Sequence, residues 1–156
     1  MASTDFDFLF GDWNVHNRKI RDNTDPECTE WIEFDARQTA SPILNGAGNV
    51  DQMWVDDFVG FTLRLYSPDG DVWRIWWSAT NAPGVLDEPV VGSFADGVGR
   101  FEGTQIVGGA ETVVRFEWTV TDPDNPKWDQ YFSRDGGETW SHNWRMSFSA
   151  APSPAR

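Results

Sequence analysis

The sequence has little cysteine and little positive charge. Its one cysteine, Cys28, excludes an internal disulfide and any metal site built from several cysteines, which suits a reducing compartment. Only 12 Lys and Arg residues stand against 25 Asp and Glu residues, for a formal net charge of −13. A duplex or another phosphate-rich partner would meet a repelling field. We therefore expect no nucleic-acid partner.

Long apolar runs are also missing. No stretch approaches the roughly 18 uninterrupted apolar residues of a membrane-spanning helix. Residues 1–7 have neither the basic start nor the apolar core of a signal peptide. The length of 156 residues suits one ordinary domain. These features predict a soluble, cytoplasmic, single-domain protein with no membrane partner.

Helical spacing of apolar residues is scarce, whereas period-two alternation recurs from Trp13 to Phe148. The class is all-β. About nine or ten strands favour a single antiparallel up-and-down barrel, because closure removes exposed sheet edges. A two-sheet sandwich is the alternative. We expect a helical turn and the barrel within residues 1–149, and a disordered tail over 150–156. The expected strands are 13–20, 29–39, 48–55, 58–66, 72–79, 90–94, 100–107, 112–121, 128–133 and 139–148.

Aromatic residues are abundant, with 10 Trp and 11 Phe against 2 Tyr. Each ring buries about 150–250 Å², so the rings could fill a small core and still line a pocket. We expect pocket rings from Trp54, Trp76, Trp118, Trp128 and Trp144. The expected polar anchors beside them are Asn49, Arg64 and Asn143.

Residues 72–79 carry tryptophan on both faces, with Trp73 and Trp77 on one and Trp76 on the other. A strand with one dry and one wet face is therefore excluded. If Arg74 and Trp76 point inward, they offer a cation beside a ring, which suits an anionic or enolic aromatic ligand. If Trp73 and Trp77 point inward, the outer Trp76 marks a homodimer contact.

Residues 6–13, F-D-F-L-F-G-D-W, resemble the opening of calycins and lipocalins, in which an aromatic turn precedes a G-x-W motif. The resemblance implies that Trp13 closes one end of the barrel against a basic side chain, for which Arg145 is the candidate. Together with G-N-V-D at 48–51, W-R-I-W-W at 73–77 and G-G-E-T-W near the end, the pattern resembles a bacterial calycin-like family of largely uncharacterised function. The likeness spans nearly the whole chain, implies the fold and names no activity.

Residues 133–140, S-R-D-G-G-E-T-W, match the S-x-D-x-G-x-x-W "Asp box" of sialidase propellers. That motif is structural: its Ser and Asp bond turn amides, its Gly supplies a positive φ and its Trp packs on the hairpin. A propeller would need several copies and a longer chain. We therefore expect a well-made hairpin here.

Nucleophilic and metal catalysis find little support. Cys28 lies in a polar loop, no serine sits in a G-x-S-x-G motif, and His16 and His142 lack metal-site spacing. Barrel closure would make the strands of these histidines neighbours, which leaves a coordinating pair as an alternative. A second alternative for His142 is haem ligation, because the nitrobindin branch of the calycins binds haem through a histidine near the C-terminus. The glycine-rich opening of that branch is absent.

The first functional hypothesis is binding of a small, mostly apolar, aromatic or conjugated metabolite inside the barrel, without a cofactor or metal. The alternatives are a cofactor-free isomerase, cyclase or decarboxylase, haem binding through His142, and a protein-interaction module. Residues 80–89 could fold over the barrel mouth as a lid. The expected catalytic residues are Arg74, Glu102, Gln130, Tyr131 and His142.

Overall fold

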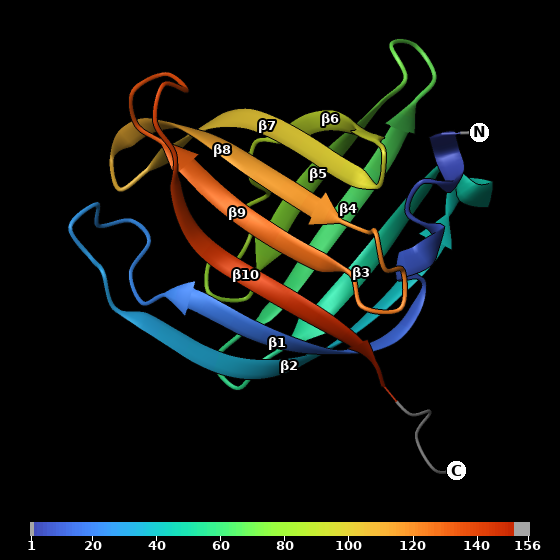
Figure 1. Ribbon diagram of the computed structural model, residues 1–156, viewed down its shortest axis with the longest axis horizontal. Helices are drawn as coiled ribbons and strands as arrows, with labels where there is room; N and C mark the ends of the chain where they lie inside the picture. The colour runs from blue at the N-terminus through green and yellow to red at the C-terminus, as the bar shows by residue number, and fades with distance from the viewer. Residues whose placement is uncertain (1, 152–156) are drawn as a thin grey trace.

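The computed structural model describes residues 2–151, which form a closed antiparallel barrel (Figure 1). Each strand pairs with its neighbours along the chain, and β10 pairs with β1 to close the ring. The predicted fold class is confirmed, and the sandwich alternative is wrong. The strands are β1 (Gly11–Ile20), β2 (Trp31–Ile43), β3 (Gly48–Trp54), β4 (Val59–Ser67), β5 (Val72–Ala79), β6 (Val90–Ala95), β7 (Val98–Val107), β8 (Ala110–Thr119), β9 (Lys127–Ser133) and β10 (Ser141–Ala150).

Helical structure in the described part is limited to the 3-10 turns η1 (Ala2–Thr4), η2 (Asp7–Leu9) and η3 (Leu44–Gly46). None of these turns has the length or the apolar character needed to cross a membrane.

Apart from residues 72–79, each expected strand differs from the observed one at one end or both, and two of these differences bear on the barrel. β2 runs past residue 39 through Pro42, which pairs with Asn49 of β3 after the pairing with β1 has ended at Ala40. A strand paired on one side tolerates proline, because that residue's missing N–H need not join a ladder. β10 includes Ala150, which pairs with Trp13, so this residue belongs to the barrel and not to the tail expected over 150–156. The rest of that tail, 152–156, lies outside the described residues.

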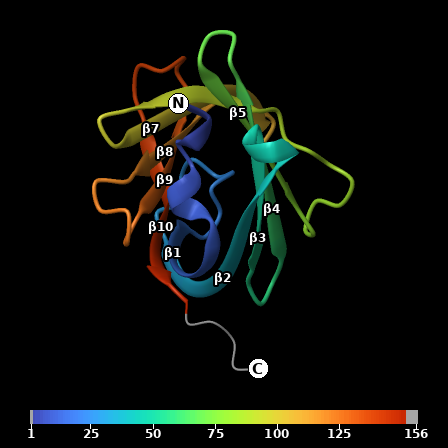
Figure 2. The same ribbon diagram turned by 90° about the vertical axis from the view of Figure 1, so that its right-hand side faces the viewer.

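The N-terminal segment closes one end of the barrel. Phe6 and Leu9 are fully buried, and Phe6 packs edge-on against Trp73 with 4.9 Å between ring centroids. Trp13 Nε1 donates to the Leu9 carbonyl oxygen at 2.8 Å. Figure 2 looks onto this end, where the blue N-terminal turns lie across the ring of strands.

Trp13 thus occupies the closed end, as the resemblance implied, but the expected packing of Trp13 against Arg145 is wrong. Trp13 packs against Phe148, with 6.0 Å between ring centroids. Arg145 instead pairs with Asp129, at 2.7 Å from Nε to Oδ1. The reason is strand alternation: the neighbours of Arg145, Trp144 and Met146, line the interior, so Arg145 points out.

Candidate ligand-binding site

The barrel holds an interior cavity of about 1410 Å³. It extends from the interior to loops at the end opposite the N-terminal turns, on the left in Figure 1. Drug-sized pockets measure roughly 300–1,000 Å³, so a small organic molecule fits. Residues of the mouth are Asn23 and Thr24 after β1, Asp56 and Asp57 after β3, Asn81 and Asp87 after β5, and Gly108 after β7.

One wall of the cavity is aromatic. Trp118, Trp128 and Trp144 lie on β8, β9 and β10, where alternation turns their side chains inward. Trp128 stands edge-on to Trp144, with 5.5 Å between ring centroids, and Trp77 of β5 contacts Trp144 at 6.3 Å. Gly60 makes room for Trp77, because a Cβ at that position would collide with the indole. These rings offer flat apolar surfaces for stacking.

The other wall is polar. Arg64 of β4 forms a buried ion pair with Asp51 of β3, at 2.7 Å between Nη2 and Oδ2, and donates from Nη1 to Asn49 Oδ1 at 3.0 Å. Gln38 and Thr62 line the cavity beside them. The Asp51 and Arg64 side chains are only 2% and 4% exposed. We call Gln38, Asn49, Asp51, Thr62 and Arg64 the inner polar cluster.

The inner polar cluster is incompletely paired. Gln38 Nε2 and Arg64 Nε are buried donors without a hydrogen-bond partner within the described part of the chain. Asp51 Oδ2 is close to Arg64 but likewise lacks a hydrogen bond of good geometry among those residues. Burial raises the pKa of Asp51, against the opposing effect of Arg64. A buried unpaired group costs about 1–3 kcal/mol, so the cluster is not arranged for stability alone.

Arg64 also faces rings. Its guanidinium carbon lies 5.0 Å from the centroid of Phe6 and 5.8 Å from that of Trp118. The cation therefore joins the inner polar cluster to the N-terminal turn and to the aromatic wall. A carboxylate and aromatic faces are both attractive neighbours for a buried guanidinium.

A bulge in β10 sets a second polar pair. The register against β9 shifts between His142 and Trp144, and the extra residue, Asn143, becomes buried. Gln130 Nε2 donates to Asn143 Oδ1 at 2.9 Å, and Gln130 lines the cavity. Asn143 Nδ2 is a further buried donor that has no partner in residues 2–151. The same bulge separates His142, which points out, from Trp144, which points in.

Of the predicted site residues, the cavity lining contains Arg64, Gln130, Trp118, Trp128 and Trp144. Asn49 and Asn143 are buried and hydrogen-bond to two of these. The remaining six lie on the outer surface, away from the cavity, because their strands present the opposite phase: Trp54, Arg74, Trp76, Glu102, Tyr131 and His142. Four of the five residues expected to be catalytic are therefore outside.

On β5, which carries tryptophan on both faces, Trp73 and Trp77 point inward and Trp76 points outward. Ile75 and Trp77 line the cavity and Trp73 is buried, whereas Trp76 is partly exposed and sits beside Leu63 of β4. Arg74 and Trp76 point outward, so the cavity does not contain the arginine beside a tryptophan ring that their inward orientation would have given. Because Trp73 and Trp77 point inward, the outward Trp76 is the residue for which we predict a homodimer contact, and that contact stays a prediction.

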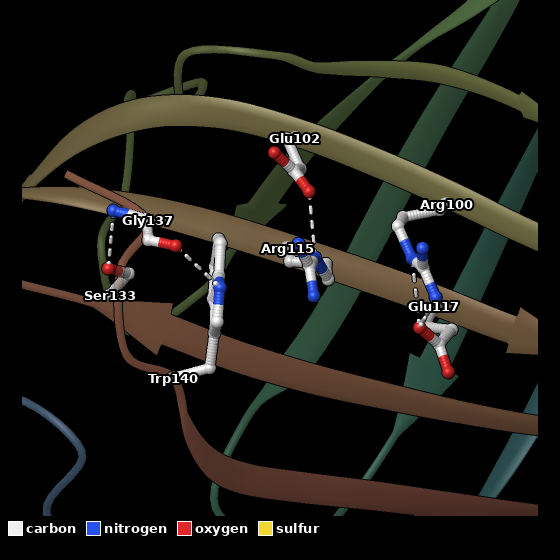
Figure 3. A network of polar contacts seen from close by, with 7 residues as sticks. All are labelled: Arg100, Glu102, Arg115, Glu117, Ser133, Gly137 and Trp140. Atoms are coloured by element: carbon white, nitrogen blue, oxygen red, sulfur yellow. Dashed lines mark hydrogen bonds and ion pairs between the residues drawn. The ribbon is translucent and has the colours of Figure 1, made fainter.

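Outward polar residues form ion pairs between β7 and β8, beside the β9–β10 connection (Figure 3). Arg115 donates to Glu102 at 2.7 Å, and Arg100 donates to Glu117 at 3.0 Å. Arg115 also covers the Trp140 ring, with its guanidinium carbon 3.8 Å from the centroid. Alternation along β8 turns Arg115 and Glu117 outward, because Val114 and Trp118 are buried on the inner face.

The expected Asp-box hairpin is present. Ser133 Oγ accepts from the Gly137 N–H at 2.8 Å, Asp135 accepts from the Thr139 N–H at 2.9 Å, and Trp140 Nε1 donates to the Gly137 carbonyl oxygen at 3.1 Å. Side-chain and backbone hydrogen bonds from Thr139, followed by that from Ser133, lower the pKa of Asp135 to about 2. The hydrogen bonds of the motif stabilise the connection between β9 and β10.

His142 faces out, where its Nε2 lies 2.7 Å from Asp129 Oδ1 and its ring contacts Tyr131. Burial alone would raise the pKa of Asp129, and the hydrogen bonds from His142 and Arg145 hold it below its ordinary value. The axial-ligand role that the resemblance implied does not fit this placement, since a haem inside the barrel would not meet the imidazole.

His16 is engaged separately, with Asp35 at 2.8 Å and Glu33 at 2.9 Å, so the two histidines do not form a coordinating pair. Across residues 2–151, no group of three or more His, Cys, Asp or Glu residues is arranged to hold a metal ion. These contacts give both imidazoles acidic partners on the outer surface.

The loop predicted to act as a lid lies at the mouth. Asn81 and Asp87 line the cavity, but Val85 and Leu86 are about half exposed. The Asp87 N–H donates to the Trp77 carbonyl oxygen at 2.9 Å, which ties the end of the loop to β5. The apolar pair therefore points away from the cavity in this conformation.

Sequence reasoning missed Lys19, Gln38, Asp51 and Thr62, all of which line the cavity. A signal was present for Lys19, because it continues the inward alternation of Trp13, Val15 and Asn17. For Asp51 and Thr62 the hydrophobic pattern was misleading: on β4 the apolar side chains of Phe61, Leu63 and Leu65 face out.

Compared with protein-family models and with curated proteins, the chain matches none of them. The likeness to a calycin family therefore stays a prediction, whereas the barrel is a property of the structure.

Proposed function

We propose that the barrel binds a small, mostly apolar, conjugated molecule that carries a hydrogen-bond-accepting group. The observation that carries this proposal is the pairing of an aromatic wall with an incompletely satisfied polar wall across one cavity. The rings of Trp118, Trp128 and Trp144 supply stacking surface for a planar body. The donors of Gln38 and Arg64 suit a carbonyl or carboxylate oxygen, and such an acceptor would remove the cost of leaving them unpaired.

The orientation of the ligand follows from the same two walls. Gln38 and Arg64 stand on β2 and β4, whereas Trp118, Trp128 and Trp144 stand on β8 to β10. A planar ligand would place its body against the rings and its acceptor toward β2 and β4. Gln130 would add a polar contact on the aromatic side, where it is already held by Asn143.

Isothermal titration calorimetry with 2-naphthoate, an aromatic carboxylate, tests the proposal. Trp128→Leu removes a cavity ring and should weaken binding about tenfold, since an aromatic contact contributes about 0.5–1.5 kcal/mol beyond its buried area. Trp76→Leu removes a ring from the outer face and is the matched control. We expect it to bind like the parent chain.

Near-ultraviolet circular dichroism would establish that both variants keep a packed core. Equal loss of affinity in the two variants, or no binding by the parent chain of this acid, its aldehyde or its alcohol, would contradict a cavity site.

A further inference from the structure

We propose that Lys19 forms a covalent imine with an aldehyde or ketone group of the bound ligand. This inference rests on the proposed function, because the carbonyl compound must first enter the cavity. It narrows the ligand class from acceptor-bearing conjugated molecules to conjugated carbonyl compounds.

The position of Lys19 supports the inference. It is the last inward residue of β1 before Ile20, and it lines the cavity on the side of its mouth. Its Nζ lies 5.2 Å from the centroid of Trp144, which pairs with it in register. A ligand stacked on the aromatic wall, with its accepting group toward Gln38 and Arg64, would therefore bring a carbonyl at its other end, nearest the mouth, close to the amine.

Lys19 has no carboxylate partner within ion-pair distance among residues 2–151, and its Nζ donates to the Ile20 carbonyl oxygen at 3.2 Å. The acid whose field reaches the amine, Asp22, is engaged elsewhere: its Oδ1 accepts from the Thr24 hydroxyl at 2.6 Å and from the Thr24 N–H at 3.0 Å. The amine is thus not locked as the cation of a salt bridge.

Its surroundings also favour the reactive form. Burial lowers the pKa of Lys19 below its ordinary value, against the opposing fields of Asp22 and Cys28. Only a neutral amine has the lone pair that attacks a carbonyl carbon, and a lysine lowered in this way is the type that forms Schiff bases.

The step balances without a cofactor. The Nζ lone pair forms a bond to the carbonyl carbon, and a proton moves from nitrogen to oxygen to give a carbinolamine. The C–O bond then breaks, oxygen leaves as water with the second proton from nitrogen, and the C=N bond forms. One amine and one carbonyl thus yield one imine and one water, with no change of oxidation state.

The chain provides its own control, because Lys19 and Lys127 are its only lysines and Lys127 is exposed on β9. The protein is incubated with 2-naphthaldehyde and sodium cyanoborohydride, which reduces an imine to a stable amine. Peptide mapping by mass spectrometry then separates adducts at Lys19, Lys127 and the α-amino group. We expect labelling at Lys19 to be about tenfold faster than at Lys127, as for a lysine of lowered pKa held beside its electrophile.

Lys19→Arg keeps the positive charge and should abolish the fast adduct, whereas Lys127→Arg should leave it unchanged. Binding of 2-naphthalenemethanol, which has no carbonyl, separates the two proposals. If the alcohol binds and Lys19 labels no faster than Lys127, the imine is overturned and the cavity proposal stands. If the aldehyde does not bind although 2-naphthoate does, only the imine falls, and if the alcohol, the aldehyde and 2-naphthoate all fail to bind, both proposals fall. Retained alcohol binding and a retained fast adduct in Lys127→Arg, with loss of that adduct in Lys19→Arg, support the imine.

Discussion

The inner polar cluster and the outer ion pairs of β7 and β8 are both built on arginine and a carboxylate, but they differ in burial and in how completely their groups are paired. On the outside, Arg100 pairs with Glu117 and Arg115 with Glu102, in contact with water. Inside, Arg64 and Asp51 are almost fully buried, and neighbouring donors remain unpaired. A buried ion pair must overcome a desolvation cost that a surface pair does not meet. This difference supports the proposal that the inner groups serve a ligand, whereas the outer groups pair with one another in contact with water.

The largest expected effect is on the inner cluster. Arg64→Met leaves Asp51 buried without its cation and should lower the free energy of unfolding by about 3–5 kcal/mol. Urea unfolding measures the loss. Adding Asp51→Leu should recover most of it, because the uncompensated charge is then gone. A loss below about 1 kcal/mol in the single variant would mean that the pair is not isolated from solvent.

A smaller effect is expected at the outer hairpin, and it depends on pH. Asp135 has a pKa lowered from 3.8 to about 2 in the folded chain, so its stabilising contribution is present above pH 3.8 and is lost as the pH falls toward 2. Asp135→Asn should therefore be less stable than the parent chain at pH 6, with a difference that shrinks by pH 2.5. Urea unfolding at pH 6 and at pH 2.5 tests this prediction, and Glu111→Gln, at an exposed position near the start of β8, is the control. A difference that stays constant with pH would contradict the assignment.

The outer ion pairs should matter least. Glu102→Gln breaks a partly exposed pair with Arg115, and the unfolding free energy should change by no more than about 1 kcal/mol. Unlike the inner pair, this contribution should fade in 1 M salt, where the screening length is about 3 Å. A loss as large as that of Arg64→Met would erase the contrast between the two networks.

Much of the fold could be predicted from the sequence, because period-two alternation and turn residues mark strands directly. Residues 72–79 were placed with the observed bounds, and the Asp-box hairpin was predicted from residue types that each have one structural role. The closed end also followed from residues 6–13, although its basic partner did not.

The site was harder, because side-chain direction depends on strand phase. One bulge at Asn143 places His142 outside and Trp144 inside, although period-two alternation alone would put both on one face. On β4 the rule that apolar residues face inward fails: Thr62 and Arg64 point into the cavity, and Leu63 points out. A polar interior violates ordinary patterning, and functional sites are where such violations are expected.

The central claim is that the inner polar cluster serves a ligand rather than the fold, and Gln38→Met tests it most directly. The variant removes a buried donor that has no partner in the described chain and keeps the side-chain shape. Unfolding free energy and affinity for 2-naphthoate are measured on the same preparation. We predict an unfolding free energy that is unchanged or higher by up to about 1 kcal/mol, together with about tenfold weaker binding. A variant that loses stability while binding 2-naphthoate as tightly as the parent chain would contradict the account.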